Sequence, residues 1–205
     1  MKLEPEKERI STVSVLPIYT YDQPVLRKKA KAVKATDDAL ARFVDDMFET
    51  MHNANGIGLA ANQVGSLQRL IVVDISDMEE WKEVKPLVLI NPLVIEEEGL
   101  LVMEEGCLSI PEIKEEVERP ESVRLQYKDM EMQDRDLRAS GMLARVIQHE
   151  IDHLNGVLFI DHVGALKRKL LRGRLNKIRR GECDVNYPIV GGTVDQREPR
   201  SVESR

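Results

Sequence analysis

The sequence is poor in cysteine and in aromatic residues. Its 205 residues include two cysteines, Cys107 and Cys183, too few for the disulfide framework that stabilises small secreted domains. Three phenylalanines, four tyrosines and one tryptophan leave the core to aliphatic residues and methionine. We therefore expect a cytoplasmic protein in which a free thiolate is available for chemistry.

Long apolar runs are also missing. The longest, such as residues 70–73 and 87–90, fall far short of the ~18 residues that a membrane span requires. The first ten residues mix acids with bases and have no apolar segment of the signal-peptide type. A net charge of −6 disfavours generic nucleic-acid binding, which depends on neutralising phosphates. The sequence thus predicts a chain without export signal or membrane contact.

The length is that of one domain, and 42% hydrophobic residues exclude wholesale disorder. Residues 1–14 are charged and aperiodic, so we interpret them as an N-terminal extension. Residues 183–205 contain Gly-Gly, two prolines and scattered charges, which is typical of a weakly ordered C-terminal tail. The folded domain is expected over residues 15–182.

Hydrophobic periodicity predicts a helix capped by Asp37 and running to about Asn53, and two later helices over residues 142–155 and 166–180. Between them lie β-branched or alternating runs that predict strands: residues 70–75, 87–96, 100–104, 122–128 and 136–140. Strands grouped between helices indicate an α+β fold rather than alternating βαβ units. We expect a single domain with mostly antiparallel strands around the first of the two later helices.

The helix predicted over residues 142–155 carries ionisable residues on the face that is expected to pack against the hydrophobic core. His149, Glu150 and His153 share its largely apolar half, where an unpaired charge is costly. They form an HExxH pattern, in which two histidines four residues apart can meet one metal ion, and the glutamate can take a proton from a bound water. Two buried histidines with satisfied hydrogen bonds are the alternative. Polar residues occupy the remaining arc: Arg145, Gln148, Asp152 and Asn155.

A metal site needs a third protein ligand. Metzincins place a histidine ten residues after the first, but position 159 is Phe159, which excludes that class. His52, His162, several carboxylates and Cys107 remain as candidates, and a lone cysteine is more often a small buried hydrophobe. Asp152 either orients a ligand or lies on a solvated face.

Three segments carry a family resemblance. Residues 56–63 (GIGLAANQ), 105–109 (EGCLS) and 148–156 (QHEIDHLNG) resemble the three signature motifs of the peptide deformylase family. The likeness extends from about Val15 to Arg180. It implies a metal-dependent hydrolase that removes the N-formyl group from the initiator methionine of newly synthesised polypeptides and releases formate.

The resemblance also implies roles for individual residues. By motif position, Cys107, His149 and His153 would hold the metal, with Fe²⁺ as the physiological ion and Zn²⁺, Ni²⁺ or Co²⁺ as substitutes. Glu150 would act as general base and then as acid. The side-chain amide of Gln63 and the backbone N–H of Leu108 would stabilise the oxyanion, as the weak electrophilicity of a formamide requires.

Substrate selectivity is expected to come from an apolar pocket for the methionine side chain. Ile57, Met142 and Val146 are the lining candidates, and the backbone of Gly58 is expected to pair with the substrate peptide; Met142 and Val146 are otherwise ordinary core residues. Family members most often have proline at the position of Asn62, so the loop before Gln63 is expected to be less rigid here.

Residues 165–180 contain eight basic residues and no acid. A docked helix with a solvated basic face is one interpretation, and contact with ribosomal RNA is the other. We expect a monomer acting on formyl-Met nascent peptides. Two alternatives are an HExxH metalloprotease and a catalytically inactive ribosome-binding homologue.

Overall fold

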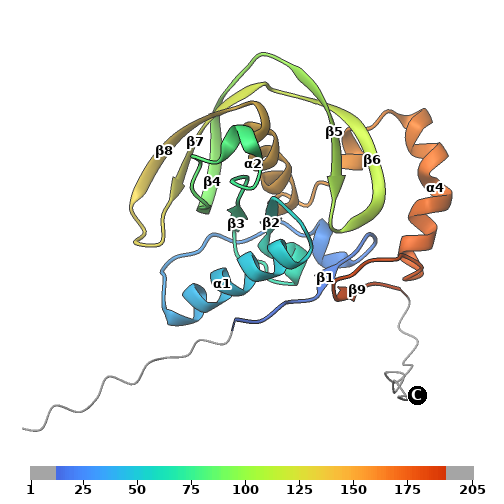
Figure 1. Ribbon diagram of the computed structural model, residues 1–205, viewed down its shortest axis with the longest axis horizontal. Helices are drawn as coiled ribbons and strands as arrows, with labels where there is room; N and C mark the ends of the chain where they lie inside the picture. Colours follow the sequence, from blue (N-terminus) through green and yellow to red (C-terminus); the bar gives the residue numbers. More distant parts are fainter. Residues whose placement is uncertain (1–12, 193–205) are drawn as a thin grey trace, which may run out of the picture.

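The computed structural model describes residues 13–192, so the expected N-terminal extension lies almost entirely outside the described residues. Helix α1 (Asp38–Asn53) precedes the long strands, and α2 (Gly141–Leu154), the short α3 (Phe159–His162) and α4 (Ala165–Arg179) follow them (Figure 1). This order confirms the predicted α+β class. None of the helices between residues 13 and 192 is both long enough and apolar enough to cross a membrane.

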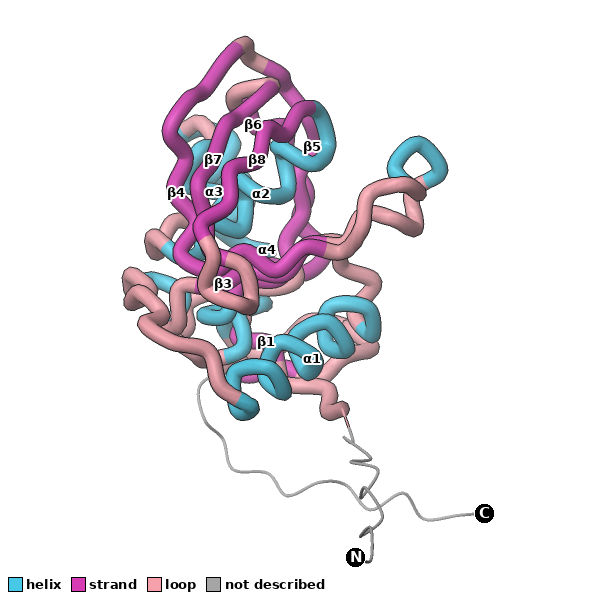
Figure 2. Tube along the Cα trace, turned by 90° about the vertical axis from the view of Figure 1, so that its left-hand side faces the viewer, coloured by secondary structure: helices cyan, strands magenta, loops and turns pink. Residues whose placement is uncertain are grey.

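Five strands form the main sheet, in the order β2-β3-β4-β7-β8, and every neighbouring pair is antiparallel. Their bounds are Gly58–Ala60 (β2), Leu70–Val73 (β3), Leu87–Glu98 (β4), Ser122–Lys128 (β7) and Asp134–Ser140 (β8). Strands β5 (Leu101–Cys107) and β6 (Ile110–Arg119) form a separate antiparallel pair. Together, β4, β5 and β6 arch over α2, as Figures 1 and 2 show from two sides.

Helix α1 begins as the sequence predicts. The Asp37 carboxylate accepts a hydrogen bond from the Leu40 N–H at 2.8 Å, which satisfies one of the unpaired donors of the first turn. The buried residues Val44, Met47 and Met51 pack in one apolar cluster with residues of β2 and β3. This packing supports the segment that follows β2.

Helix α2 occupies the interior. Its apolar face, including Ala144, Ile147 and Leu154, belongs to the main hydrophobic cluster with residues of the sheet. Part of the polar arc is buried as well, because the arch covers it: Arg145 is 4% exposed and Gln148 is 7% exposed, whereas Asp152 and Asn155 are half-buried. The helix is therefore central, as expected, but has less contact with water than its sequence suggests.

Strand β6 was missing from the sequence-based prediction. Its sequence, IPEIKEEVER, combines one proline with six charged residues, and this composition obscures the alternation of a strand. The buried positions Ile110, Ile113 and Val117 supply an apolar face toward α3 and α4. Burial against distant helices, rather than local propensity, determines this strand.

Residues 183–192, the first part of the predicted C-terminal tail, include a short strand; residues 193–205 lie outside the described residues. Strand β9 (Ile189–Val190) pairs in parallel with β1 (Ile18–Tyr19). A Cβ atom on Gly191 would lie 2.0 Å from the Thr20 hydroxyl oxygen. The Gly-Gly pair that resembles a flexible linker therefore permits a close backbone approach.

Candidate active site

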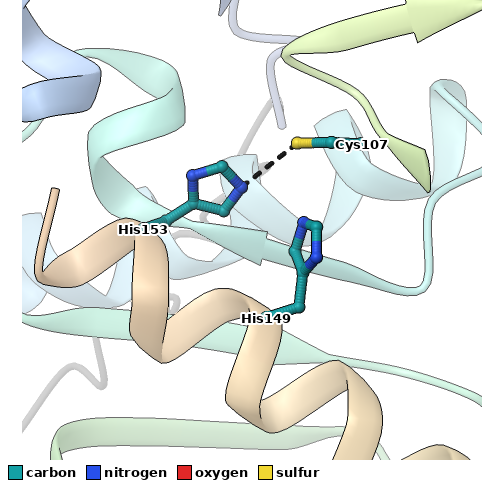
Figure 3. A group of neighbouring side chains, drawn as sticks. All are labelled: Cys107, His149 and His153. Atoms are coloured by element: carbon teal, nitrogen blue, oxygen red, sulfur yellow. Dashed lines mark hydrogen bonds between the residues drawn. The ribbon is translucent and has the colours of Figure 1, made fainter. Parts of the chain in front are cut away.

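The three sequence motifs meet at the centre of the molecule. His149 and His153 rise from successive turns of α2, with ring centroids 5.0 Å apart, and Cys107 ends β5 opposite them (Figure 3). The Cys107 Sγ lies 3.1 Å from Nε2 of His153. One ligand atom from each of the three residues falls within 4.8 Å of the others. Among the sequence-based candidates for a third ligand, the structure thus places Cys107 beside the histidines.

The other two histidines lie elsewhere and have partners of their own. His52 pairs with Asp74 at 2.9 Å, and His162 pairs with Asp152 at 2.7 Å. Asp152 also accepts a hydrogen bond from Arg119 at 2.7 Å. Asp152 therefore belongs to an ion network beside the site. The carboxylate that orients a candidate metal ligand, His149, is a different one.

That carboxylate is Glu105. Its Oε2 lies 2.9 Å from Nδ1 of His149, which assigns the proton to Nδ1 and leaves Nε2 free to bind a metal. One thiolate and two imidazoles form a donor set that suits divalent transition metals. Nδ1 of His153 is buried without a hydrogen-bond partner among the described residues, and Nε2, which lies 3.1 Å from the Cys107 sulfur, is the nitrogen positioned to bind a metal. The residues present therefore fit one metal ion.

Two buried arginines surround Glu105. Arg119 donates to it at 2.6 and 3.0 Å, and Arg145 donates at 2.7 Å. Burial alone would raise the pKa of Glu105, but the hydrogen bonds from His149 and Arg119 outweigh it and hold this pKa well below its usual range. Sequence reasoning missed this cluster, because its members come from β5, β6 and α2 and only the fold brings them together.

Glu150 lies in an environment suited to proton transfer. Glu150 is 4% exposed, and its Oε2 has no hydrogen-bond partner within residues 13–192. Burial raises the pKa of Glu150 to about 7. A carboxyl group with a pKa near neutrality can both accept and return a proton.

Gly58 explains why the first motif needs glycine. A Cβ atom at this position would lie 2.6 Å from Cγ1 of Val146 and 2.7 Å from Oε1 of Glu150. The backbone of β2 therefore runs directly against the HExxH helix. Any side chain larger than hydrogen at this position would meet Val146 and the Glu150 carboxylate.

Gln63 is held in one orientation. Its Oε1 accepts a hydrogen bond from the Ala60 N–H at 2.7 Å, so its Nε2 faces the site, 3.3 Å from the Ser109 hydroxyl and 3.6 Å from the Cys107 sulfur. This assignment follows from the hydrogen-bond network. An amide donor is thereby presented beside the candidate metal ligands.

Asn62 does not loosen the loop before Gln63. Its side chain is fully buried, and its Nδ2 donates to the backbone carbonyl of His153 at 2.5 Å. The amide ties the loop to the last turn of the HExxH helix. The restraint that proline would supply through its backbone comes here from a long-range hydrogen bond.

A cavity of about 580 Å³ opens beside this group. All of the predicted site residues except His153 line it: Ile57, Gly58, Gln63, Cys107, Leu108, Met142, Val146, His149 and Glu150. Asp184, Val185 and Tyr187 from the C-terminal segment line it as well, and no sequence motif indicated them. The structure thus brings the sequence-based candidates together, and their individual roles stay predictions.

Comparisons with known proteins agree with this geometry. A family model described as polypeptide deformylase matches residues 15–169. A peptide deformylase of Salinibacter ruber is 48% identical over 184 residues, covering 86% of this chain and 94% of that protein. A second, from Chlorobium phaeovibrioides, is 47% identical over 175 residues, covering 85% and 92%.

Solved structures resemble the chain over similar lengths. The crystal structure of a peptide deformylase from Legionella pneumophila has a TM-score of 0.76 at 38% identity and covers 82% of this chain and 98% of that one. A Synechococcus elongatus peptide deformylase in complex with actinonin has a TM-score of 0.70 at 47% identity, with coverage of 79% and 84%. Sequence, fold and the arrangement of the site agree, and the chain belongs to the polypeptide deformylase family.

Proposed function

We propose that this protein is a metal-dependent hydrolase that removes the N-formyl group from the terminal methionine of newly synthesised polypeptides and releases formate. One observation carries the proposal: a buried carboxyl group, an oriented amide donor and a Cys/His/His group line or adjoin the same cavity. Formamide hydrolysis needs these three elements together, because the carbonyl is a weak electrophile.

Glu150 and the two hydrogen-bond donors have distinct tasks in this reaction. Glu150 takes the proton of the attacking water and then delivers it to the nitrogen of the leaving amine. Nε2 of Gln63 and the backbone N–H of Leu108 donate to the formyl oxygen as it gains negative charge. By analogy with other acyl-transfer sites, each such donor lowers the barrier by ~2.7–4 kcal/mol.

Cys107, His149 and His153 would hold the metal, which, when bound, supplies Lewis acidity to the water and to the carbonyl. Fe²⁺ is the proposed physiological ion, with Zn²⁺, Ni²⁺ and Co²⁺ as substitutes. The donor set supports this range, because one thiolate and two imidazoles accept each of these ions. The ion network around Glu105 keeps His149 oriented for this task.

Ile57, Met142 and Val146 are proposed to contact the methionine side chain of the substrate. They line one cavity, and their apolar surfaces suit an unbranched thioether. Gly58 and the strand before Gly106 would pair with the substrate backbone, a mode that reads main chain rather than sequence.

The central test combines metal analysis with a formate-release assay on formyl-Met peptides, using protein purified under argon. Wild type is expected to contain one divalent ion and to release formate. Glu150→Gln is expected to retain the metal and to lose about 10²–10⁴-fold in kcat. Full activity of Glu150→Gln would refute the assigned mechanism, and peptide-bond cleavage instead of formate release would indicate a protease.

We further propose that the protein works as a cytoplasmic monomer and contacts the ribosome through residues 165–180. The fold already uses part of this basic helix: Lys167 pairs with Glu115, and Arg179 pairs with Asp22. Three exposed residues of its first half have no ion pair among the described residues: Arg168, Lys169 and Arg172. They leave positive charge available to phosphates.

Charge reversal at Arg168, Lys169 and Arg172 should reduce co-sedimentation with ribosomes, most clearly at low salt, without changing formate release from short peptides. Equal co-sedimentation of wild type and the triple variant would dispose of the ribosome contact. Replacing exposed charges is preferable to deleting the helix, because Leu171, Leu175 and Ile178 are buried.

A further inference from the structure

The chain returns to the active site after α4. From Arg179 it turns back toward β1, as the orange-red segment in Figure 1 shows, and β9 adds to that strand. The Ile18 N–H donates to the Pro188 carbonyl and the Thr20 N–H donates to the Val190 carbonyl, both at 2.9 Å. These bonds place the preceding residues against the catalytic cavity.

Tyr187 makes the most specific contact of this segment. It is half-buried, and its hydroxyl donates a hydrogen bond to the backbone carbonyl of Leu108 at 2.9 Å. Burial raises the pKa of Tyr187 above its ordinary value, so the phenol stays protonated and remains a donor. The contact is thus a hydrogen bond to the turn itself and not only apolar packing around it.

The turn between β5 and β6 is held from three sides. Tyr187 binds the carbonyl of Leu108, the Tyr21 N–H donates to the carbonyl of Ser109 at 2.7 Å, and Gln63 donates to the Ser109 hydroxyl at 3.3 Å. Tyr21 lies two residues after β1, the strand that pairs with β9. The C-terminal segment therefore supports the turn directly through Tyr187 and indirectly through β1.

We propose that Tyr187 is a positioning residue for the Leu108 N–H: by holding the Leu108 carbonyl, its hydroxyl aligns the turn so that this N–H points at the developing oxyanion. The inference rests on the proposed function, in which Leu108 is an oxyanion donor. Such donors act only when they are fixed in advance at the position that the charge will occupy. If the turn were not anchored, the free-energy cost of aligning it would add to the activation barrier.

Tyr187→Phe tests this directly, because it keeps the ring and removes the hydroxyl. We expect kcat for a formyl-Met peptide to fall about tenfold and KM to stay within about twofold, since complete loss of an oxyanion donor costs roughly 10²–10³. Metal content should be unchanged. Amide hydrogen exchange of the peptide covering residues 105–110 should become faster.

Tyr127→Phe is the matched control. It removes a tyrosine hydroxyl from β7, in the main sheet and outside the cavity lining, and should change neither kcat nor exchange at residues 105–110. Wild-type kcat in Tyr187→Phe would overturn the proposal, as would a raised KM with unchanged kcat, which would make Tyr187 only a wall of the pocket.

The two levels of inference fail in different ways. If wild type releases no formate, the proposed function is wrong and the assignment to oxyanion positioning falls with it. If wild type is active, and Tyr187→Phe shows wild-type kcat and wild-type amide hydrogen exchange at residues 105–110, only the role of Tyr187 is wrong.

Discussion

Replacing Glu105 by glutamine should show how strongly the site depends on one buried carboxylate. Glu105 is 5% exposed and accepts hydrogen bonds from Arg119, Arg145 and His149. A glutamine in this position keeps the shape but loses the charge and offers an NH₂ group where the neighbours also donate. Glu105→Gln is therefore expected to weaken both the fold and the metal site.

The size of the effect follows from the remaining partners. Breaking a buried ion pair by removing one member costs about 3–5 kcal/mol. Arg119 still has Asp152, and Arg145 still donates to the Val117 carbonyl at 2.9 Å, so we expect the lower end, about 3 kcal/mol. For a protein of this size that is a fall in Tm of roughly 6–12 °C. Loss of the bond to His149 should weaken metal binding roughly 10–100-fold.

Glu104→Gln is the matched control on the adjacent residue. The Glu104 side chain is 63% exposed, and its ion pair with Lys114 spans 3.4 Å, so the same substitution should cost at most about 0.5 kcal/mol. Thermal unfolding followed by circular dichroism would measure stability, and competition with a chromophoric chelator for Ni²⁺ would measure metal affinity. Equal Tm and equal affinity in the two variants would refute the reasoning.

Other substitutions test separate contacts. Asn62→Ala should lower the free energy of unfolding by about 1–2 kcal/mol in urea titrations; an unchanged midpoint would mean that its buried amide bond contributes nothing. Gly58→Ala should reduce kcat by about 10–10²-fold with little loss of secondary structure, because the new Cβ displaces the Glu150 carboxylate, and wild-type turnover would contradict that close approach. Gly191→Ala should cost about 1–3 kcal/mol by overpacking, and adding Thr20→Ala, which removes the clashing hydroxyl, should restore part of it; a double variant no more stable than Gly191→Ala would argue against the clash.

Local patterns were sufficient for several elements. The Asp37 cap and the spacing of apolar residues predicted α1, and the HExxH spacing placed two imidazoles on one face of α2. These features depend on neighbours three or four residues apart, which the sequence displays directly. Cys107 was different: residue chemistry left it as one of several candidates, and only the family motif singled it out.

Long-range packing decided the rest. Strand β6 is charged and contains proline, so its strand character depends on burial against α3 and α4. Arg145 and Glu105 are charged residues, which are expected at the surface when the sequence is considered alone. The arch over α2 buries them together as an ion pair. A buried charge is tolerable when its partner is present, and that partner lies 40 residues away along the chain.

The sequence by itself determined the family, the α+β class and the residues of the three motifs, because each is a pattern of residue types at short spacing. Only the tertiary structure decided that Gly191 packs against Thr20 beside β1 and that Tyr187 reaches Leu108. The physical reason is that glycine and tyrosine carry no local signal for these contacts. Their roles follow from the side chain of Thr20 and from the turn between β5 and β6, which lie 171 and 79 residues earlier in the sequence, respectively.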